Sequence, residues 1–207
     1  MTKHLAKEIQ IVKLVIFTIT FVVTFCQSWA CAHDNCDSTW AKTVGRGRKQ
    51  KTTLECYYHD IISGESPTAV LIAKANGSTN VAPLAFGNLF IFDDSLTVGP
   101  DPTSKLVGRA QGMYGSDSLG EVGLIMAMGF TFSEGIYNGS SISIIVHNPI
   151  TVKHRELPII GGTGLFRMAQ GYAVPNTYML DLSTGDAIVG YNVTIFHYKK
   201  DYIYMGW

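Results

Sequence analysis

The sequence has no excess of charge of either sign. Its 207 residues hold 16 Lys and Arg against 16 Asp and Glu. Proteins that bind nucleic acid or anionic membranes usually carry a basic patch, and no net positive charge is available here to build a large one. We therefore expect neither nucleic acid nor a membrane as a partner.

Motifs for metal, nucleotide or redox chemistry are also missing. The six histidines do not follow the spacing of a zinc or copper site, and no dinucleotide fingerprint occurs. A phosphate-binding loop would need Lys and Ser or Thr directly after its last glycine, whereas Gly164 is followed by Leu165 and Phe166. We expect no metal, no cofactor and no oxidase activity of the protein's own.

The chain lacks an apolar run of the roughly 20 residues that a membrane-spanning helix needs. Its longest run, residues 14–26, has about 13 residues, follows three lysines and precedes small residues that include Ala30 and Ala32. This layout predicts a secretory signal peptide over residues 1–32, cleaved after Ala30 or Ala32, and hence a secreted protein of the extracellular space. A retained membrane anchor is the alternative.

Cysteine is scarce, with four residues in the chain. Cleavage after Ala32 leaves Cys36 and Cys56, and cleavage after Ala30 adds Cys31. Because secretion permits disulfides, a single Cys36–Cys56 bridge is one option that the sequence leaves open.

Three sequons support a secreted glycoprotein: Asn76-Gly-Ser, Asn138-Gly-Ser and Asn192-Val-Thr. The first two lie in turn-like Asn-Gly contexts, whereas Asn192 lies inside a strand pattern. We expect glycosylation at Asn76 and Asn138, and less readily at Asn192.

Long helical periodicity is absent from the rest of the chain. Residues 33–52 are polar and basic and predict a disordered segment. From residue 53 onward, nine strand-like runs alternate with turns, near 53–61, 68–74, 84–94, 104–115, 122–132, 141–147, 155–160, 168–176 and 188–198. This pattern predicts one all-β domain over residues 53–207, a sandwich or a closed barrel, and an eight-stranded barrel has room for one small ligand.

Asp60 is the first candidate for chemistry. Side chains alternate along a strand, so Asp60 shares a face with Leu54, Cys56 and Tyr58. If that face lines the barrel interior, desolvation favours the neutral carboxyl, which could act as a general acid. The alternative is that Asp60 merely caps the following turn.

The stretch from His147 to Val174 is the second candidate. Arg155 precedes an apolar run, where a cation is costly unless it is paired, and the glycines after residue 160 allow a tight corner before Phe166. We therefore expect the Phe166 ring to lie near Arg155. On the strand over 104–115, Tyr114 lies beside small residues and could hydrogen-bond a ligand.

Four blocks of this sequence resemble the plant dirigent family. They are YYHDI at 57–61, FGNLFIFDD at 86–94, LVGRAQGMY at 106–114 and ELPIIGGTGLFRMAQGYA at 156–173. The resemblance implies an eight-stranded antiparallel β-barrel of the dirigent and allene-oxide-cyclase type, a homotrimer secreted to the apoplast. It also implies that Asp60 is the family's first-strand acid, Arg155 its pocket arginine, and Tyr114 and Phe166 part of the cavity wall.

The resemblance implies a small phenolic substrate of phenylpropanoid metabolism. Some members direct the stereochemistry of phenoxyl radical coupling, with the radicals supplied by a separate laccase or peroxidase. Others act on quinone methides, including ring-closing dehydration to pterocarpans. Asn148 departs from the family, because radical-coupling members resemble Asp-Pro at this place, and an amide cannot donate a second acidic proton. Asn148 is instead expected to orient a substrate oxygen.

We therefore expect a dirigent protein that controls stereochemistry in phenoxyl coupling or quinone-methide chemistry, with a pathway other than double-cyclising lignan formation favoured by Asn148. One alternative is an enzyme in its own right, a dehydratase or cyclase that closes a ring through a quinone methide. The other is a barrel that binds phenolics without catalysis.

Overall fold

The computed structural model of the protein describes residues 47–75 and 82–198. The expected signal peptide, Cys36 and the sequon at Asn76 lie outside these residues. Within them no helix is long and apolar enough to cross a membrane.

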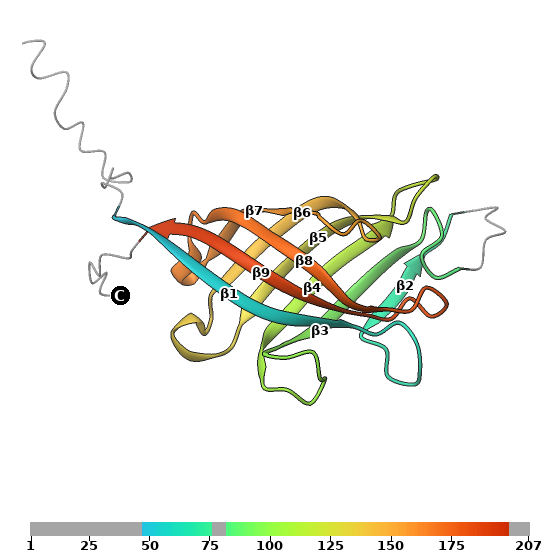
Figure 1. Cartoon of the computed structure of the whole chain (residues 1–207), viewed down its shortest axis with the longest axis horizontal. Coiled ribbons are helices and arrows are strands. Elements are labelled where there is room, and N and C mark those ends of the chain that lie inside the picture. Colours follow the sequence, from blue (N-terminus) through green and yellow to red (C-terminus); the bar gives the residue numbers. More distant parts are fainter. Residues whose placement is uncertain (1–46, 76–81, 199–207) are drawn as a thin grey trace, which may run out of the picture. The chain divides into compact units, whose positions relative to one another are not determined.

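Nine strands and two short 3-10 helices make up the described chain (Figure 1). The strands are β1 Lys49–Asp60, β2 Ala69–Ala73, β3 Leu89–Thr97, β4 Leu106–Ser116, β5 Gly123–Phe132, β6 Ser141–Pro149, β7 Leu157–Thr163, β8 Gln170–Leu180 and β9 Ala187–Tyr198. The helices are η1 Gly135–Tyr137 and η2 Gly164–Phe166. All nine strand-like runs of the sequence are strands, with shifted ends.

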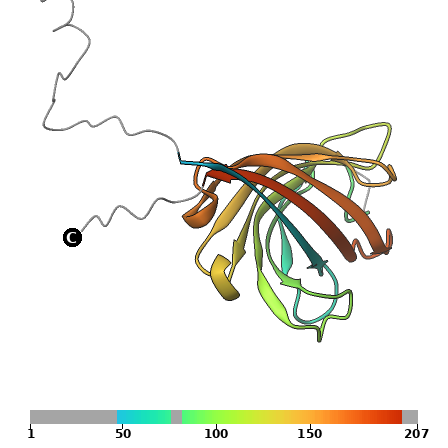
Figure 2. The same cartoon turned by 60° about the vertical axis from the view of Figure 1, so that its left-hand side comes forward.

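The strands form one antiparallel sheet that closes on itself, as Figure 2 shows from the side. The order runs β1, β9, β8, β7, β6, β5, β4, β3, and the ring closes where Tyr57 to His59 of β1 pair with Ser95 to Thr97 of β3. β2 is the ninth strand, paired with β3 over residues 89–92, beyond the part of β3 that meets β1. The prediction of an eight-stranded antiparallel barrel is confirmed, with β2 as an extra short strand.

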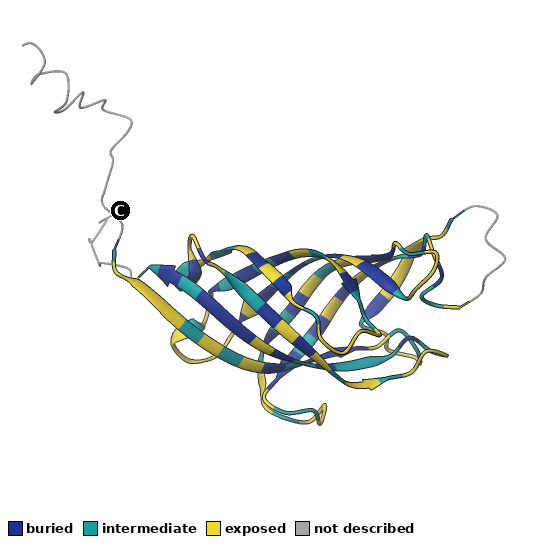
Figure 3. Cartoon of the chain, turned by 45° about the horizontal axis from the view of Figure 1, so that its top comes forward, coloured by how far each residue is buried: buried dark blue, intermediate teal, exposed yellow. Residues whose placement is uncertain are grey.

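Burial alternates along the strands because successive side chains point into and out of the barrel (Figure 3). The interior is filled with aromatic and branched side chains, which gain about 1.5–3 kcal/mol each from leaving water. Rings pack in pairs there, with Phe90 stacked on Tyr114 at 5.1 Å between centroids and Phe130 edge-on to Tyr191 at 5.2 Å. These contacts fix the positions of Tyr114 and Tyr191, of which Tyr191 lines the cavity described below.

The expectation that residues 33–52 are disordered is wrong for residues 49–52. β1 begins at Lys49, where residues 49–52 pair with residues 195–198 of β9. Strand pairing overrides the polar composition here, because the long β9 offers a ladder of backbone hydrogen bonds to those residues.

Cys56 is buried on the inward face of β1 and has no disulfide partner among residues 47–75 and 82–198. Burial, together with the nearby Glu55 carboxylate, raises the pKa of this thiol to about 12, so it is an inert core residue rather than a nucleophile. Of the sequons, Asn138 is exposed in the turn after η1 and Asn192 is exposed on the outer face of β9.

Candidate functional site

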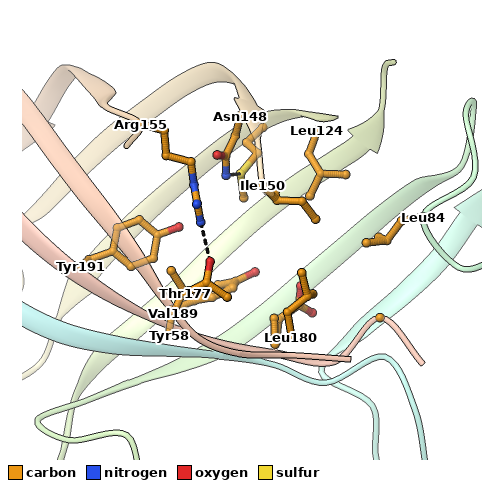
Figure 4. Close-up of a pocket in the computed structure, with 14 residues that line it drawn as sticks. Tyr58, Leu84, Leu124, Asn148, Ile150, Arg155, Thr177, Leu180, Val189 and Tyr191 are labelled. Carbon is orange, nitrogen blue, oxygen red and sulfur yellow. Dashed lines mark hydrogen bonds between the residues drawn. The ribbon is translucent and has the colours of Figure 1, made fainter. Parts of the chain in front are cut away.

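One end of the barrel holds a cavity that encloses about 480 Å³ between its atoms, the open mouth included. Its walls come from five strands and the loops at that end of the barrel (Figure 4). The lining residues are Tyr58, Asp60, Leu84, Leu124, Met126, Asn148, Ile150, Arg155, Thr177, Leu180, Gly185, Ala187, Val189 and Tyr191.

Asp60 is the carboxyl group among these lining residues. Only 7% of it is exposed, and its Oδ1 accepts a hydrogen bond of 3.2 Å from the Tyr114 hydroxyl. Burial, reinforced by the nearby Asp94 carboxylate, raises the pKa of Asp60 well above its usual range. Burial therefore favours the protonated, neutral form of this side chain.

Asp94 is a second interior carboxyl, which the sequence reasoning did not single out. It is fully buried on β3, and neither of its oxygens has a hydrogen-bond partner of ordinary geometry. Burial raises its pKa to about 6, against the opposing influence of the Thr68 and Tyr58 hydroxyls. Asp94 does not line the cavity, so its part is to raise the proton affinity of Asp60 from behind.

Alternation along β3 could have identified Asp94. It shares its face with Phe90, Phe92 and Leu96, all of which are buried. The same argument that placed Asp60 inside the barrel therefore applies to Asp94.

Arg155 reaches into the cavity from the loop between β6 and β7, next to Tyr191 in Figure 4. It donates to the backbone oxygen of Val152 at 2.7 Å and to Oγ1 of Thr177 at 2.8 Å. Its Nε is buried without a partner, and burial lowers the pKa of the guanidinium. A cation held only by neutral acceptors can stabilise negative charge on a bound oxygen.

Asn148 of β6 lies in the wall with 3% of its surface exposed. Its amide nitrogen donates to the sulfur of Met126 at 3.2 Å, and its amide oxygen is buried without a partner. The hydroxyl of Tyr58, also in the wall, is buried near the carboxyl groups of Asp60 and Asp94 and lowers the pKa of both. A ligand with a hydroxyl group could satisfy the amide oxygen of Asn148, since an unmet polar atom in an apolar site is costly.

The structure thus brings three of the expected site residues, Asp60, Arg155 and Asn148, to one cavity. Tyr114 is not in the wall. It stands behind Asp60 as the hydrogen-bond donor to its carboxyl group, with 1% of its surface exposed.

The expected placement of Phe166 beside Arg155 is wrong. Gly164 does take a left-handed φ of 61°, and the corner that it allows buries Phe166 completely. The ring stacks on Tyr137 at 5.5 Å and lies edge-on to His197 at 5.3 Å. His197 pairs with Gln50, ten residues before Asp60 on β1, which is roughly 30 Å along a strand. Phe166 therefore belongs to the core at the opposite end of the barrel.

No three His, Cys, Asp or Glu side chains within residues 47–75 and 82–198 gather in a way that could hold a metal ion. The polar groups of the cavity are instead a neutral acid, an arginine, an amide and hydroxyls.

The fold is thus a closed antiparallel barrel whose interior cavity is lined by a buried acid and an arginine among mostly apolar residues. The profile of the Dirigent-like protein family matches residues 51–196. The chain is 54% identical over 160 residues to dirigent protein 23 of Arabidopsis thaliana, which covers 77% of this chain and 85% of that protein. The chain therefore belongs to the dirigent family.

Two further similarities concern proteins named pterocarpan synthase. Pterocarpan synthase 1 of Glycyrrhiza echinata is 46% identical over 156 residues, which covers 75% of this chain and 82% of that protein. The solved structure of the pterocarpan synthase dirigent protein GePTS1 superposes with a TM-score of 0.71 at 44% identity, and covers 78% of this chain and 91% of that one.

Proposed function

We propose that this dirigent protein binds a phenolic of phenylpropanoid or isoflavonoid metabolism in the Asp60 cavity and directs its stereochemistry at the quinone-methide stage. The observation that carries the proposal is Asp60 itself, a buried carboxyl with a raised pKa that lines the same mainly apolar cavity as Arg155. A neutral acid and a cation in one cavity suit a reaction in which a hydroxyl leaves and phenolate charge develops.

The reaction that fits best is ring closure with loss of water. Asp60 gives its proton to a benzylic hydroxyl, the carbon–oxygen bond breaks and water leaves. The phenol conjugated with that carbon releases its proton, so that a quinone methide forms. A second phenol of the same molecule then attacks the carbon and passes its proton to Asp60, while the quinone-methide oxygen regains a proton. The net change is loss of one water, and Asp60 ends as it began.

The remaining wall residues serve the same steps. Arg155 stabilises the negative charge that develops on the phenolic oxygen, and the unpaired amide oxygen of Asn148 accepts a hydrogen bond from a substrate hydroxyl. The apolar residues of the wall hold the flat rings in one pose and exclude water, which would otherwise trap the quinone methide.

A second candidate function uses the same pose without the acid step. In it the barrel orients phenoxyl radicals that a separate laccase or peroxidase supplies, so that their coupling gives one stereoisomer. Membership of the dirigent family supports this candidate.

Two assays separate these candidates. Incubation of the purified protein with an isoflavan-4-ol and no oxidant should give the ring-closed product if the protein is a dehydratase. Coupling of monolignols by laccase in its presence, followed by chiral analysis, tests the auxiliary role. Product in the first assay excludes a purely auxiliary protein. Blank results in both, with a phenolic still bound, would leave only a non-catalytic binding barrel.

We further propose that the mature protein is a homotrimer. A belt of apolar side chains crosses the outer face of the barrel, in register from strand to strand: Val70, Ile91, Met113, Ala127 and Ile145. Four of them are 39–52% exposed. A contiguous apolar patch on an outer face supports burial against other copies of the chain.

We also propose secretion to the apoplast and glycosylation. The signal-peptide pattern of residues 1–32 supports the first. The exposure of Asn138 and Asn192, each within a sequon, supports the second.

A further inference from the structure

The barrel wall has a window between β6 and β8. Pairing between β6 and β7 ends at Ile144 and Ile159, although β6 continues to Pro149. Pairing between β7 and β8 ends at Leu157 and Ala173, although β8 continues to Leu180. The loop of residues 150–156 covers this window, and Arg155 extends from it toward Thr177 of β8 (Figure 4).

A second pocket lies against the window. It encloses about 730 Å³ between its atoms, open solvent included, and shares four wall residues with the Asp60 cavity: Ile150, Arg155, Thr177 and Leu180. Its other polar residues are Thr151, Lys153 and Asn176. We call this the outer pocket. The inner cavity is mainly apolar around its acid, whereas the outer pocket adds a second cation and neutral hydrogen-bonding groups.

The two cations of the outer pocket have no carboxylate to balance them. Among the residues that the structure describes, neither Arg155 nor Lys153 forms an ion pair. Glu156 follows Arg155 in the chain, but it is exposed and makes no ion pair with either cation. Asp181, just after β8, accepts hydrogen bonds from Ser183 instead.

The hydrogen bonds of Arg155 also leave room for a stronger acceptor. Its guanidinium is held by one carbonyl and one hydroxyl, and its Nε is buried and unpaired. An arginine binds a carboxylate with two parallel charge-assisted bonds, which are stronger than bonds to neutral oxygens. A carboxylate at the window could therefore replace Thr177 as the acceptor and satisfy Nε as well.

We propose that the outer pocket binds a carboxylate carried on the side arm of the phenolic substrate, whose aromatic ring lies in the inner cavity. Arg155 contacts the carboxylate at the window and Lys153 contacts it from the outer side. Phenolics with an acidic substituent should thus bind more tightly than uncharged phenolics of the same shape. This inference rests on the phenolic-binding function proposed above.

The test uses two ligands that differ in charge and hardly in shape, 4-hydroxycinnamate and its methyl ester. Isothermal titration calorimetry of the full mature protein at pH 7 and low ionic strength measures both dissociation constants. The acid should bind about tenfold more tightly than the ester, as expected for about 1.4 kcal/mol. Lys153→Ala should weaken binding of the acid about fivefold and leave that of the ester unchanged.

Lys105→Ala is the matched control, because Lys105 pairs with Glu134 at 2.9 Å and lines neither pocket. It should change neither constant. Equal affinity for the acid and the ester would overturn this inference but not the proposed function. The same holds if Lys153→Ala weakens the binding of both ligands equally. If Lys153→Ala still binds the acid more tightly than the ester by the wild-type factor, the outer pocket is excluded as the carboxylate site. The carboxylate would then contact Arg155 from within the inner cavity. Failure of both ligands to bind overturns the phenolic-binding function as well.

Discussion

The hydroxyl of Tyr114 on β4 donates a hydrogen bond of 3.2 Å to the carboxyl group of Asp60 on β1, inside the barrel. This bond stabilises the ionised form of Asp60 and so lowers its pKa, whereas burial and the Asp94 carboxylate raise it, and the two upward influences prevail. The proton affinity of the proposed acid is therefore set by neighbours that act in opposite directions. Each neighbour can be removed by a nearly isosteric substitution.

Replacing the acid itself should abolish chemistry and spare the fold. Asp60→Asn keeps the shape of the side chain but leaves no acidic proton, so turnover of an isoflavan-4-ol should fall by about 10²–10⁴-fold. Steady-state kinetics measures this loss, and thermal unfolding checks that the barrel is intact. Asp93→Asn, at an outward-facing position where the carboxylate pairs with Arg109, is the matched control and should retain activity. Undiminished turnover in Asp60→Asn would exclude Asp60 as the acid.

Tyr114→Phe should shift the pH dependence without removing the acid. Loss of the hydroxyl removes a bond that favours the carboxylate, so the pKa of Asp60 rises further. Activity requires neutral Asp60, and therefore the alkaline limb of the kcat/KM profile should move to higher pH. A profile of kcat/KM against pH is the measurement. An unchanged limb would mean that Asp60 is not the group that titrates in it.

Asp94→Asn should move the same limb in the opposite direction. Its carboxylate repels negative charge on Asp60, so an uncharged amide lowers the pKa of Asp60 and brings the alkaline limb to lower pH. A purely structural role for Asp94 would change the rate but not the position of the limb. If the alkaline limb moves to higher pH in Tyr114→Phe and to lower pH in Asp94→Asn, relative to wild type, the result supports the proposed influence of Tyr114 and Asp94 on Asp60.

The same substitution should also change stability in a pH-dependent way. The pKa of Asp94 rises from 3.8 to about 6 on folding, so the native state holds its proton more tightly than the unfolded chain. The stability that this provides is complete below about pH 4 and is lost as pH rises through 6, a loss of about 3 kcal/mol. Asp94→Asn should therefore be more stable than wild type at pH 8 by up to that amount and similar at pH 4. Urea unfolding at the two values tests this, with Glu65→Gln, at an exposed position outside the strands, as control.

Alternation of side chains was enough to place part of the site from the sequence. The apolar neighbours of Asp60 on β1 made an interior position one of two alternatives, the other being a cap of the following turn, and the structure places Asp60 in the interior. The same rule applied to β3 would have found Asp94. Asp94 is buried behind the cavity wall because of how β3 and β4 pack against β1. The alternation of side chains along a single strand does not contain that information.

The position of Phe166 could not be judged from its distance to Arg155 along the chain. Only ten residues lie between the two, but seven of them form β7. An extended strand carries the chain about 3.3 Å per residue, so β7 runs most of the way along the barrel and delivers Phe166 to the other end. Proximity in sequence implies proximity in space across a turn, and here it does not because a strand lies between.

Phe166→Leu should accordingly affect stability and leave substrate binding unchanged. The ring is fully buried among Phe132, Tyr137 and His197, so its loss leaves a cavity in the core at a cost of about 1–2 kcal/mol. The midpoint of thermal unfolding should fall while KM stays constant. Ile150→Ala, in the wall of the Asp60 cavity, is the contrasting variant and should raise KM. A raised KM in Phe166→Leu would show that the Phe166 ring contributes to substrate binding after all.

Met113→Glu should dissociate the proposed trimer. Met113 lies at the centre of the belt, in register with Ile91 on one side and Ala127 on the other, and its side chain points away from the barrel interior. A buried carboxylate without a partner costs several kcal/mol at an interface, enough to favour separate subunits at micromolar concentration. Sedimentation equilibrium should give the mass of three chains for wild type and of one for the variant. Leu182→Glu, which is also exposed and apolar but lies in the turn between β8 and β9, should remain trimeric. A wild-type monomer, or a trimer that survives Met113→Glu, would show that this belt is not the interface.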